Sequence, residues 1–154
     1  MSYRYPAHQI QEITRASKVL RENQSVTPEK LGEHGAKFHS YLDLVDGPAL
    51  VDLRFHGRAG SLTATSSYAA TLILDAERVR GVDYCPVGRK RLRTKERIPP
   101  GWHQNLCDPN LPTNDLRANR HDPLPEFQPI DFTDFTEKIA AMWNIDLGWE
   151  KGLV

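Results

Sequence analysis

The chain has few of the features that define extracellular and membrane proteins. Its two cysteines among 154 residues, Cys85 and Cys107, are too few for a disulfide scaffold and lack the C-x-x-C spacing of a zinc knuckle. No apolar run approaches the roughly 18 residues that a transmembrane helix needs, and the first residues lack the apolar stretch of a signal peptide. We therefore expect a single cytoplasmic domain over 1–154, with free thiols and no membrane partner.

The chain also lacks a net charge, because 20 Lys and Arg balance 20 Asp and Glu. An even distribution would exclude a strongly basic nucleic-acid binder, but the distribution is uneven. Residues 78–97 hold eight basic and two acidic residues, a net of +6, whereas 108–154 hold four basic and nine acidic, a net of −5. The basic stretch is dense enough to follow a phosphate backbone or to bind an acidic partner protein. It is equally suited to pair with the acidic C-terminal third.

Seven of the basic residues form the candidate binding set for nucleic acid or a partner. They are Arg80, Arg89, Lys90, Arg91, Arg93, Lys95 and Arg97.

The periodicity of apolar residues predicts an α+β fold. Helical spacing between Pro6 and Glu22 predicts an amphipathic helix, and Thr27-Pro28-Glu29 is typical of the start of a second, short one. Four strand-like runs follow, at 38–45, 50–56, 62–75 and 79–85, with connections too short for crossovers. We expect a four-stranded or larger, mostly antiparallel sheet with N-terminal helices and a C-terminal helix packed on one face.

Regular periodicity nearly disappears after the fourth strand. Seven of the eleven prolines lie between Pro86 and Gln128, and proline removes the backbone donor that a ladder needs. We expect an irregular segment with one short strand near 116–121. The single domain therefore divides into a helical part (1–36), a β-meander (37–85), a Pro-rich irregular segment (86–130) and a closing helix (131–147).

The closing helix has the clearest local signals. Thr133 is the predicted N-cap, with Asp134 and Glu137 favouring the positive end of the helix. The residues that share one apolar face at helical spacing are Phe135, Ile139, Met142 and Trp143. This stripe predicts docking on the sheet.

Two histidines lie in chemically suggestive surroundings. His103 follows the Pro-Pro-Gly-Trp turn, and His121 lies between Arg120 and Asp122. Asp122 is placed to orient the imidazole, and Arg120 to neutralise developing negative charge. Two imidazoles beside arginines suffice for metal-independent acid–base cleavage of RNA. The alternative is a loop held together by buried polar side chains.

The other histidines suggest less. His39 and His56 lie on the first two predicted strands and approach one another if those strands pair, although most sheet histidines serve structure. A metal site built from His103, Asp108, His121 and Asp122 has no ligand pair at helical or zinc-finger spacing. No metal and no other cofactor is expected.

The order of features in about residues 70–146 resembles the TumE-like small toxin families of bacterial toxin–antitoxin modules and their uncharacterised relatives. A β-meander precedes the histidine-bearing turn Ile98–Asn105, a second histidine follows in Asn119–Asp122, and a closing helix runs from Phe132-Thr133-Asp134 to Asn144-Ile145. The resemblance implies a small α+β protein from a mobile-element or defence locus, with a cognate antitoxin as partner. By position it carries over only His103 and His121.

This chain departs from the family pattern in two respects. It has Asn119-Arg120-His121 where the families often have His-x-His, and neither its first 36 residues nor its basic run at 88–97 belongs to the resemblance. These departures leave catalysis less supported than the fold relationship.

Two hypotheses from different classes follow. In the first, the protein is toxin-like and acts on RNA: arginines of the basic stretch bind phosphate, and His103 and His121 perform acid–base cleavage. In the second, it is a non-catalytic adaptor or inhibitor from a phage or defence system, which binds a partner protein through its basic 88–97 segment and acidic C-terminal third. The first requires the two imidazoles to lie within about 8 Å of each other in one cleft.

Overall fold

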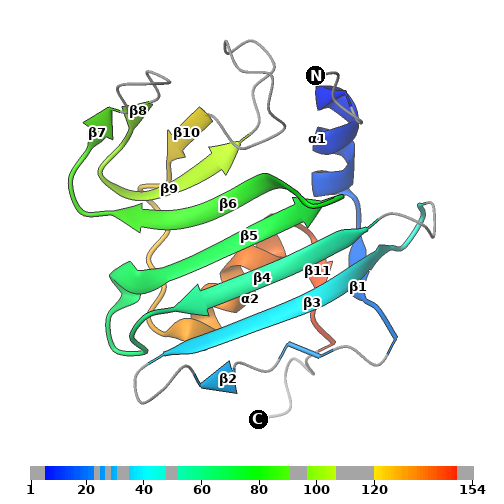
Figure 1. Ribbon diagram of the computed structural model, residues 1–154, viewed down its shortest axis with the longest axis horizontal. Coiled ribbons are helices and arrows are strands. Elements are labelled where there is room, and N and C mark those ends of the chain that lie inside the picture. Colours follow the sequence, from blue (N-terminus) through cyan, green and yellow to red (C-terminus); the bar gives the residue numbers. More distant parts are fainter. Residues whose placement is uncertain are drawn as a thin grey trace.

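The structure of the protein, a computed structural model, describes residues 6–22, 25–26, 29–30, 35–47, 52–90, 97–106 and 120–148 (Figure 1). Its elements in chain order are α1 (Ala7–Arg15), β1 (Lys18–Leu20), β2 (Glu29–Lys30), β3 (Ala36–Leu44), β4 (Leu53–Ala59), a 3₁₀ turn (Thr65–Ser67), β5 (Tyr68–Leu74), β6 (Glu77–Cys85), β7 (Arg89–Lys90), β8 (Arg97–Ile98), β9 (Gly101–Leu106), β10 (Arg120–Pro123), α2 (Phe132–Met142) and β11 (Ile145–Asp146). The class is α+β, as the periodicity predicts.

A single nine-stranded sheet dominates the described structure. Its order is β10-β9-β6-β5-β4-β3-β1-β11, and β2 also pairs with β3. The meander β3-β4-β5-β6 is antiparallel throughout, because each connection is too short for a crossover. Among the described strands, only β1 and β11 pair in parallel, and β7 and β8 form a separate two-stranded sheet.

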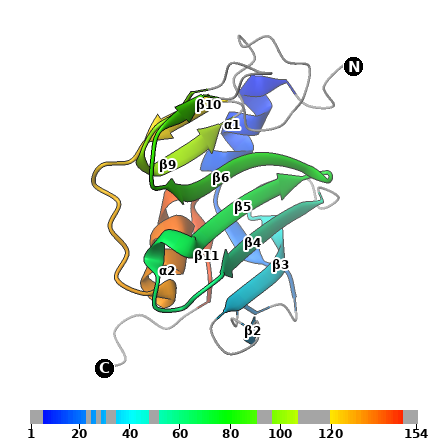
Figure 2. The ribbon, with the colours of Figure 1, turned by 60° about the vertical axis from the view of Figure 1, so that its left-hand side comes forward.

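Alternation along the central strands separates a buried face from an open face. On β4, Leu53 and Phe55 are 0 % exposed, whereas Arg54 and His56, which alternate with them, face the other side. The buried face packs against α2, whose Phe135 and Ile139 belong to the same apolar core as Ile10 of α1. The open face is opposite α2 and lies toward the viewer in Figure 1, with α2 behind the strands; Figure 2 shows the sheet turned by 60°.

The N-terminal part differs from the prediction. α1 ends at Arg15 instead of extending to Glu22, because Ala16 adopts an extended conformation and Lys18 enters the sheet as the start of β1. Instead of a second helix, Glu29–Lys30 form the strand β2; Thr27 and residues 31–34 lie outside the described part of the chain. Pairing with β3 overrides the local helix signals at both places.

The Pro-rich segment is more regular than predicted. β9 pairs with β6 along its whole length, and β10 pairs with β9. Prolines are tolerated because Pro99 and Pro100 lie in the turn before β9 and Pro123 ends the sheet's last strand. Gly101 permits this turn with a φ of 83°. The predicted short strand near 116–121 corresponds to β10, of which only Arg120 and His121 fall inside the predicted range.

The closing helix forms where predicted, but its ends differ. Its N-cap is Asp131, whose carboxylate accepts the Asp134 backbone N–H at 2.7 Å, so Thr133 lies inside the helix. The helix ends at Met142, Asn144 takes a φ of 56°, and Ile145 then begins β11. No helix within the described ranges is long and apolar enough to span a membrane.

Candidate functional site

The pairing of six strands places one straight row of side chains across the open face. Each member pairs with the next on the neighbouring strand, so all point to the same side of the sheet. This central row consists of His39, His56, Thr71, Gly81, Asn105 and His121. Its middle positions, Thr71 and Gly81, have small side chains that project little from the sheet. Histidines, which project further, lie at both ends of the row.

Two further rows flank the central row. Their members lie two residues from it along β3, β4 and β5, and a bulge places Arg78 three residues from Gly81 on β6. The arginine row consists of Tyr41, Arg54, Ile73 and Arg78, and the lysine row consists of Lys37, Arg58 and Ala69. Arg54 is held by two hydrogen bonds to the Asp52 carboxylate, at 3.0 and 2.9 Å. Lys37, Arg58 and Arg78 have no acidic partner among the described residues. These three cations therefore give the open face a local positive charge on both sides of the central row.

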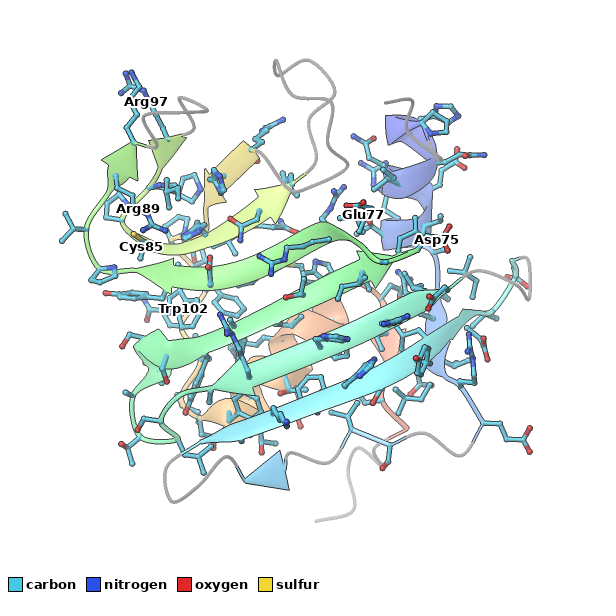
Figure 3. All side chains as sticks on the ribbon, viewed as in Figure 1. Asp75, Glu77, Cys85, Arg89, Arg97 and Trp102 are labelled. Carbon is cyan, nitrogen blue, oxygen red and sulfur yellow. The ribbon has the colours of Figure 1, made fainter. Side chains whose placement is uncertain are left out.

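Two hollows follow the central row and meet at Arg78. The first is lined by His39, His56, Thr71 and the three unpaired cations, and its described lining contains no acidic residue. The second lies beside the β7–β8 hairpin, and its polar lining includes Glu77, Arg78, Asp83, Arg89, His103, Asn105 and His121. Arg78 lines both hollows, so they are neighbours on the open face, and we refer to the two together as the trough. Figure 3 labels Glu77 and Arg89 toward opposite ends of β6.

His103 is the buried member of the histidine cluster. It is 2 % exposed, its Nε2 lies 2.6 Å from Asp83 Oδ1, and its Nδ1 lies 3.2 Å from the Gly101 carbonyl oxygen. Both partners accept, so the contacts favour a ring in which both nitrogens donate, which is the imidazolium form. Burial alone lowers the pKa of His103, but the Asp83 carboxylate outweighs burial and raises it. With both nitrogens engaged, His103 holds Asp83 in place.

Asn105 connects this ion pair to His121. Its Nδ2 donates to Asp83 Oδ1 at 3.2 Å, so its Oδ1 faces His121 Nδ1, at 2.6 Å. Since an amide oxygen only accepts, Nδ1 of His121 must carry a proton, and in the neutral ring Nε2 carries the lone pair. The chain Asp83–Asn105–His121 therefore fixes the tautomer of an imidazole that lines the trough.

The rings of His103 and His121 lie 5.8 Å apart between centroids and line the same hollow. This separation meets the distance that the hypothesis of RNA cleavage requires. The other two predicted catalytic residues, Arg120 and Asp122, bind each other at 3.0 Å. Strand alternation directs both to the face opposite His121, where Asp122 pairs with Gln104. The orientation of His121 thus comes from Asn105 instead of Asp122.

The predicted binding residues are distributed unevenly. Arg89, Lys90 and Arg97 are exposed on the β7–β8 hairpin, whereas Arg91, Arg93 and Lys95 lie outside the described residues. Arg80 is only 7 % exposed. It pairs with Leu72 on the buried face of the sheet, so it cannot contribute to a surface for phosphate.

His39 and His56 pair directly across β3 and β4, with ring centroids 4.0 Å apart. Burial, the nearby His39 and the positive charges of Arg54 and Arg78 lower the pKa of His56 to about 4, so His56 is neutral at pH 7. Its Nε2 is buried and has no hydrogen-bond partner within the described part of the chain.

Comparison with protein-family models, with curated proteins and with solved structures finds no match. The resemblance to the TumE-like families therefore stays a prediction. Over the described ranges, no group of three or more His, Cys, Asp and Glu side chains is placed to hold a metal ion. The predicted metal-ligand candidate Asp108 lies outside these ranges.

Sequence reasoning missed most of the trough. The set that it did not select consists of Lys37, Arg58, Thr71, Arg78, Gly81, Asp83 and Asn105. A signal was present in the period-two pattern of β4, where Arg54, His56 and Arg58 occupy every second position. That pattern predicts a cationic open face on one strand, but only the pairing register aligns it with neighbouring strands.

Proposed function

We propose that the protein binds RNA along the central row of the open face and cleaves it beside His121. The arrangement of the rows carries this proposal, because small residues lie in the middle, unpaired cations lie on both sides and an oriented imidazole lies at one end. A phosphate backbone along the central row meets Arg78 on one side and Lys37 and Arg58 on the other. Guanidinium and ammonium groups are the side chains that most often bind phosphate.

The proposed chemistry assigns the base to Nε2 of His121. This nitrogen is buried in the structure, so the proposal requires the side chains over it to move aside when RNA binds. This nitrogen removes the proton of a ribose 2′-hydroxyl, and the 2′-oxygen attacks the adjacent phosphorus as the bond to the 5′-oxygen breaks. Arg78 and Arg89 line the same hollow and stabilise the charge that develops on the phosphate oxygens. The products are a 2′,3′-cyclic phosphate and a 5′-hydroxyl, and the proposed reaction uses no metal.

The geometry favours a different role for His103 than the one expected from the sequence. A general acid must present a proton to the leaving oxygen, but both nitrogens of His103 already donate within the protein. We assign His103 as a positioning residue that holds Asp83 and, through Asn105, His121. Water then supplies the proton to the departing 5′-oxygen.

Binding is tested by titrating single-stranded RNA into the wild type and into the double variant Arg58→Ala/Arg78→Ala at several salt concentrations. Each lost phosphate contact lowers the slope of log K against log salt by about 0.7, so the double variant is expected to lose about 1.4. The matched control is Arg120→Ala/Lys138→Ala, which removes two exposed cations outside the trough. Equal losses in both variants would show that the trough is not the binding site.

Cleavage is tested on RNA in the presence of EDTA, with product ends identified by mass spectrometry. We expect cyclic phosphate ends from the wild type and a rate about 100- to 10,000-fold lower in His121→Ala, the usual contribution of a general base. His8→Ala, an exposed histidine on α1, is the matched control. An undiminished rate in His121→Ala, or no cleavage of any RNA with or without divalent ions, would refute the assignment.

The resemblance to the TumE-like families adds a setting to the proposal: a toxin from a bacterial mobile-element or defence locus, held by a cognate antitoxin. Induced expression in a bacterium is then expected to arrest growth with the wild type and not with His121→Ala. Equal growth with both would remove the toxin part of the proposal.

One observation favours the alternative, a non-catalytic adaptor or inhibitor. Arg89, Lys90 and Arg97 are exposed, and no ion pair between described residues joins them to the acidic C-terminal third. The basic hairpin is thus available to an acidic partner protein. Charge reversal at Arg89 and Lys90 that weakens a protein complex, together with no RNA binding by the wild type, would support this alternative.

A further inference from the structure

The end of the central row farthest from His121 presents a cluster of planar side chains. His39 is exposed on β3, with its ring centroid 4.0 Å from that of His56 and 5.2 Å from that of Tyr41. Planar groups packed in this way form a surface on which another ring can stack. The cluster lies in the same trough as the cations, so a strand bound there reaches it without leaving the sheet.

Neighbouring charges hold this cluster rigid. The guanidinium carbons of Arg21 and Arg54 lie 5.1 and 5.2 Å from the centre of the Tyr41 ring. Each guanidinium is held in turn by a carboxylate, Arg21 by Asp43 at 3.2 Å and Arg54 by Asp52 at 2.9 Å. Tyr41 therefore has little freedom to move, and it supports the imidazole of His39 beside it. A platform fixed in advance loses little conformational entropy when a ligand binds.

The width of the trough selects a single strand. The arginine row and the lysine row are four residues apart along each strand, which is about 13 Å at 3.3 Å per residue. One backbone with its bases fits between them, whereas the bases of a duplex are paired with each other and cannot reach His39. A flat sheet with exposed planar side chains is a general means of binding unpaired bases.

We propose that His39 is the stacking platform for an unpaired nucleobase, so that the ligand of the trough is single-stranded nucleic acid bound with one base on His39. This inference rests on the proposed function, because it needs the backbone to lie along the central row. It goes further by naming the strandedness of the substrate and the residue that binds a base.

The test compares oligomers that differ only in their bases. The probes are deoxythymidylate of about ten nucleotides and an abasic tetrahydrofuran oligomer of the same length, neither of which has the 2′-hydroxyl needed for cleavage. Stacking on one side chain is worth about 1–3 kcal/mol. We therefore expect His39→Ala to bind the base-containing oligomer about tenfold more weakly and the abasic oligomer with unchanged affinity. His8→Ala is the matched control.

Two replacements separate stacking from charge. His39→Tyr keeps a ring without a positive charge and is expected to bind the base-containing oligomer as tightly as the wild type. His39→Lys supplies a cation without a ring and is expected to bind as weakly as His39→Ala. Rescue by Lys and not by Tyr would overturn the stacking role. Circular dichroism of each variant checks that the exposed substitution leaves the fold intact.

The outcomes distinguish this inference from the proposed function. Equal affinity of the wild type for both oligomers would overturn the inference and leave backbone binding standing. Tighter binding of a duplex than of a single strand would also overturn the inference and leave backbone binding standing. Binding of neither oligomer, with RNA also unbound, would overturn the inference together with the proposed function.

Discussion

Asp83 has the most consequential contacts of any single residue of the site. Its carboxylate binds His103 Nε2 at 2.6 Å and Asn105 Nδ2 at 3.2 Å, and Asn105 in turn orients His121. Burial raises the pKa of Asp83, but the hydrogen bonds from His103 and Asn105 outweigh it and hold the pKa below its usual range. One carboxylate therefore favours the charged form of His103 and, through Asn105, fixes the orientation of His121.

Replacing Asp83 by Asn is expected to destabilise the fold in a pH-dependent way. The raised pKa of His103 contributes stability that is complete below pH 6.5 and is lost as the pH rises through the pKa of His103 in the folded protein. The lowered pKa of Asp83 contributes stability that is complete above pH 3.8 and is lost as the pH falls through the pKa of Asp83 in the folded protein. The difference between wild type and Asp83→Asn is therefore largest between these two values. We expect the free energy of unfolding to differ by about 2 kcal/mol there. This is less than for a fully buried ion pair, because the Asp83 side chain is half exposed.

Urea unfolding at several pH values, with NMR titration of the His103 ring, measures both effects. Asp122→Asn is the control, since its exposed pair with Arg120 is worth at most about 1 kcal/mol at any pH. A loss of stability in Asp83→Asn that does not vary with pH would contradict the role of the ion pair.

At the scale of single elements, β4 shows how one strand serves both faces of the sheet. Arg54, His56 and Arg58 belong to the open face, while Leu53, Phe55 and Gly57 are buried. Gly57 is required because the ring of its cross-strand partner Phe38 lies over it. A β-carbon at Gly57 would overlap that ring.

Gly57→Ala is therefore expected to cost about 2 kcal/mol of stability, the usual penalty for overpacking a core. Gly60→Ala is the matched control, because its β-carbon would lie at an ordinary 3.6 Å from Ser67. Thermal or urea unfolding of both variants measures the difference. Equal stability of the two variants would mean that Phe38 moves aside at no cost.

Lys18 joins the two helices and the sheet at the scale of the whole molecule. It is 1 % exposed, and its Nζ donates to the carbonyl oxygens of Thr14, Ala16 and Trp143 at 2.6, 2.8 and 2.6 Å. These carbonyls belong to the C-terminal ends of α1 and α2, where the helix dipoles favour a cation. Burial and the positive charge of Arg80 lower its pKa to about 8.

Lys18→Met keeps the length of the side chain and removes its three donors. We expect a loss of about 2–4 kcal/mol, because buried carbonyl groups are left without partners. Lys138→Met, an exposed lysine on α2 whose partner is Asp134, is the control and should change stability by less than about 0.5 kcal/mol. A similar small effect of both substitutions, by urea unfolding at neutral pH, would show that the three hydrogen bonds add little.

Local patterns in the sequence predicted the parts of the molecule whose cause is local. Alternation of apolar and polar residues located the meander from β3 to β6, because each face of a strand meets a different environment. The stripe that contains Phe135 and Ile139 located α2 for the same reason. The cap was misplaced by two residues, since both Asp131 and Thr133 are good N-caps and the tertiary position of the helix decides between them.

The candidate site depended on distant pairing, which local patterns do not reveal. His103 and His121 were selected by their neighbours in the chain, but the groups that contact them, Asp83 and Asn105, come from register between strands. β9 was hidden by Pro99 and Pro100 just before it, because prolines are harmful inside a paired strand and not at its ends.

The amino-acid sequence by itself determined the α+β class, the buried apolar positions and the polar surface of each strand, because these follow from spacing along one segment. Only the tertiary structure decided which polar residues lie together. It aligned side chains from six strands into one row, with His39 at one end and His121 at the other, and it directed Arg80 to the buried face of the sheet. The physical reason is that the pairing register between strands brings residues that are far apart in the chain onto one surface. A register shift of one residue would turn the side chains of a strand to the other face of the sheet.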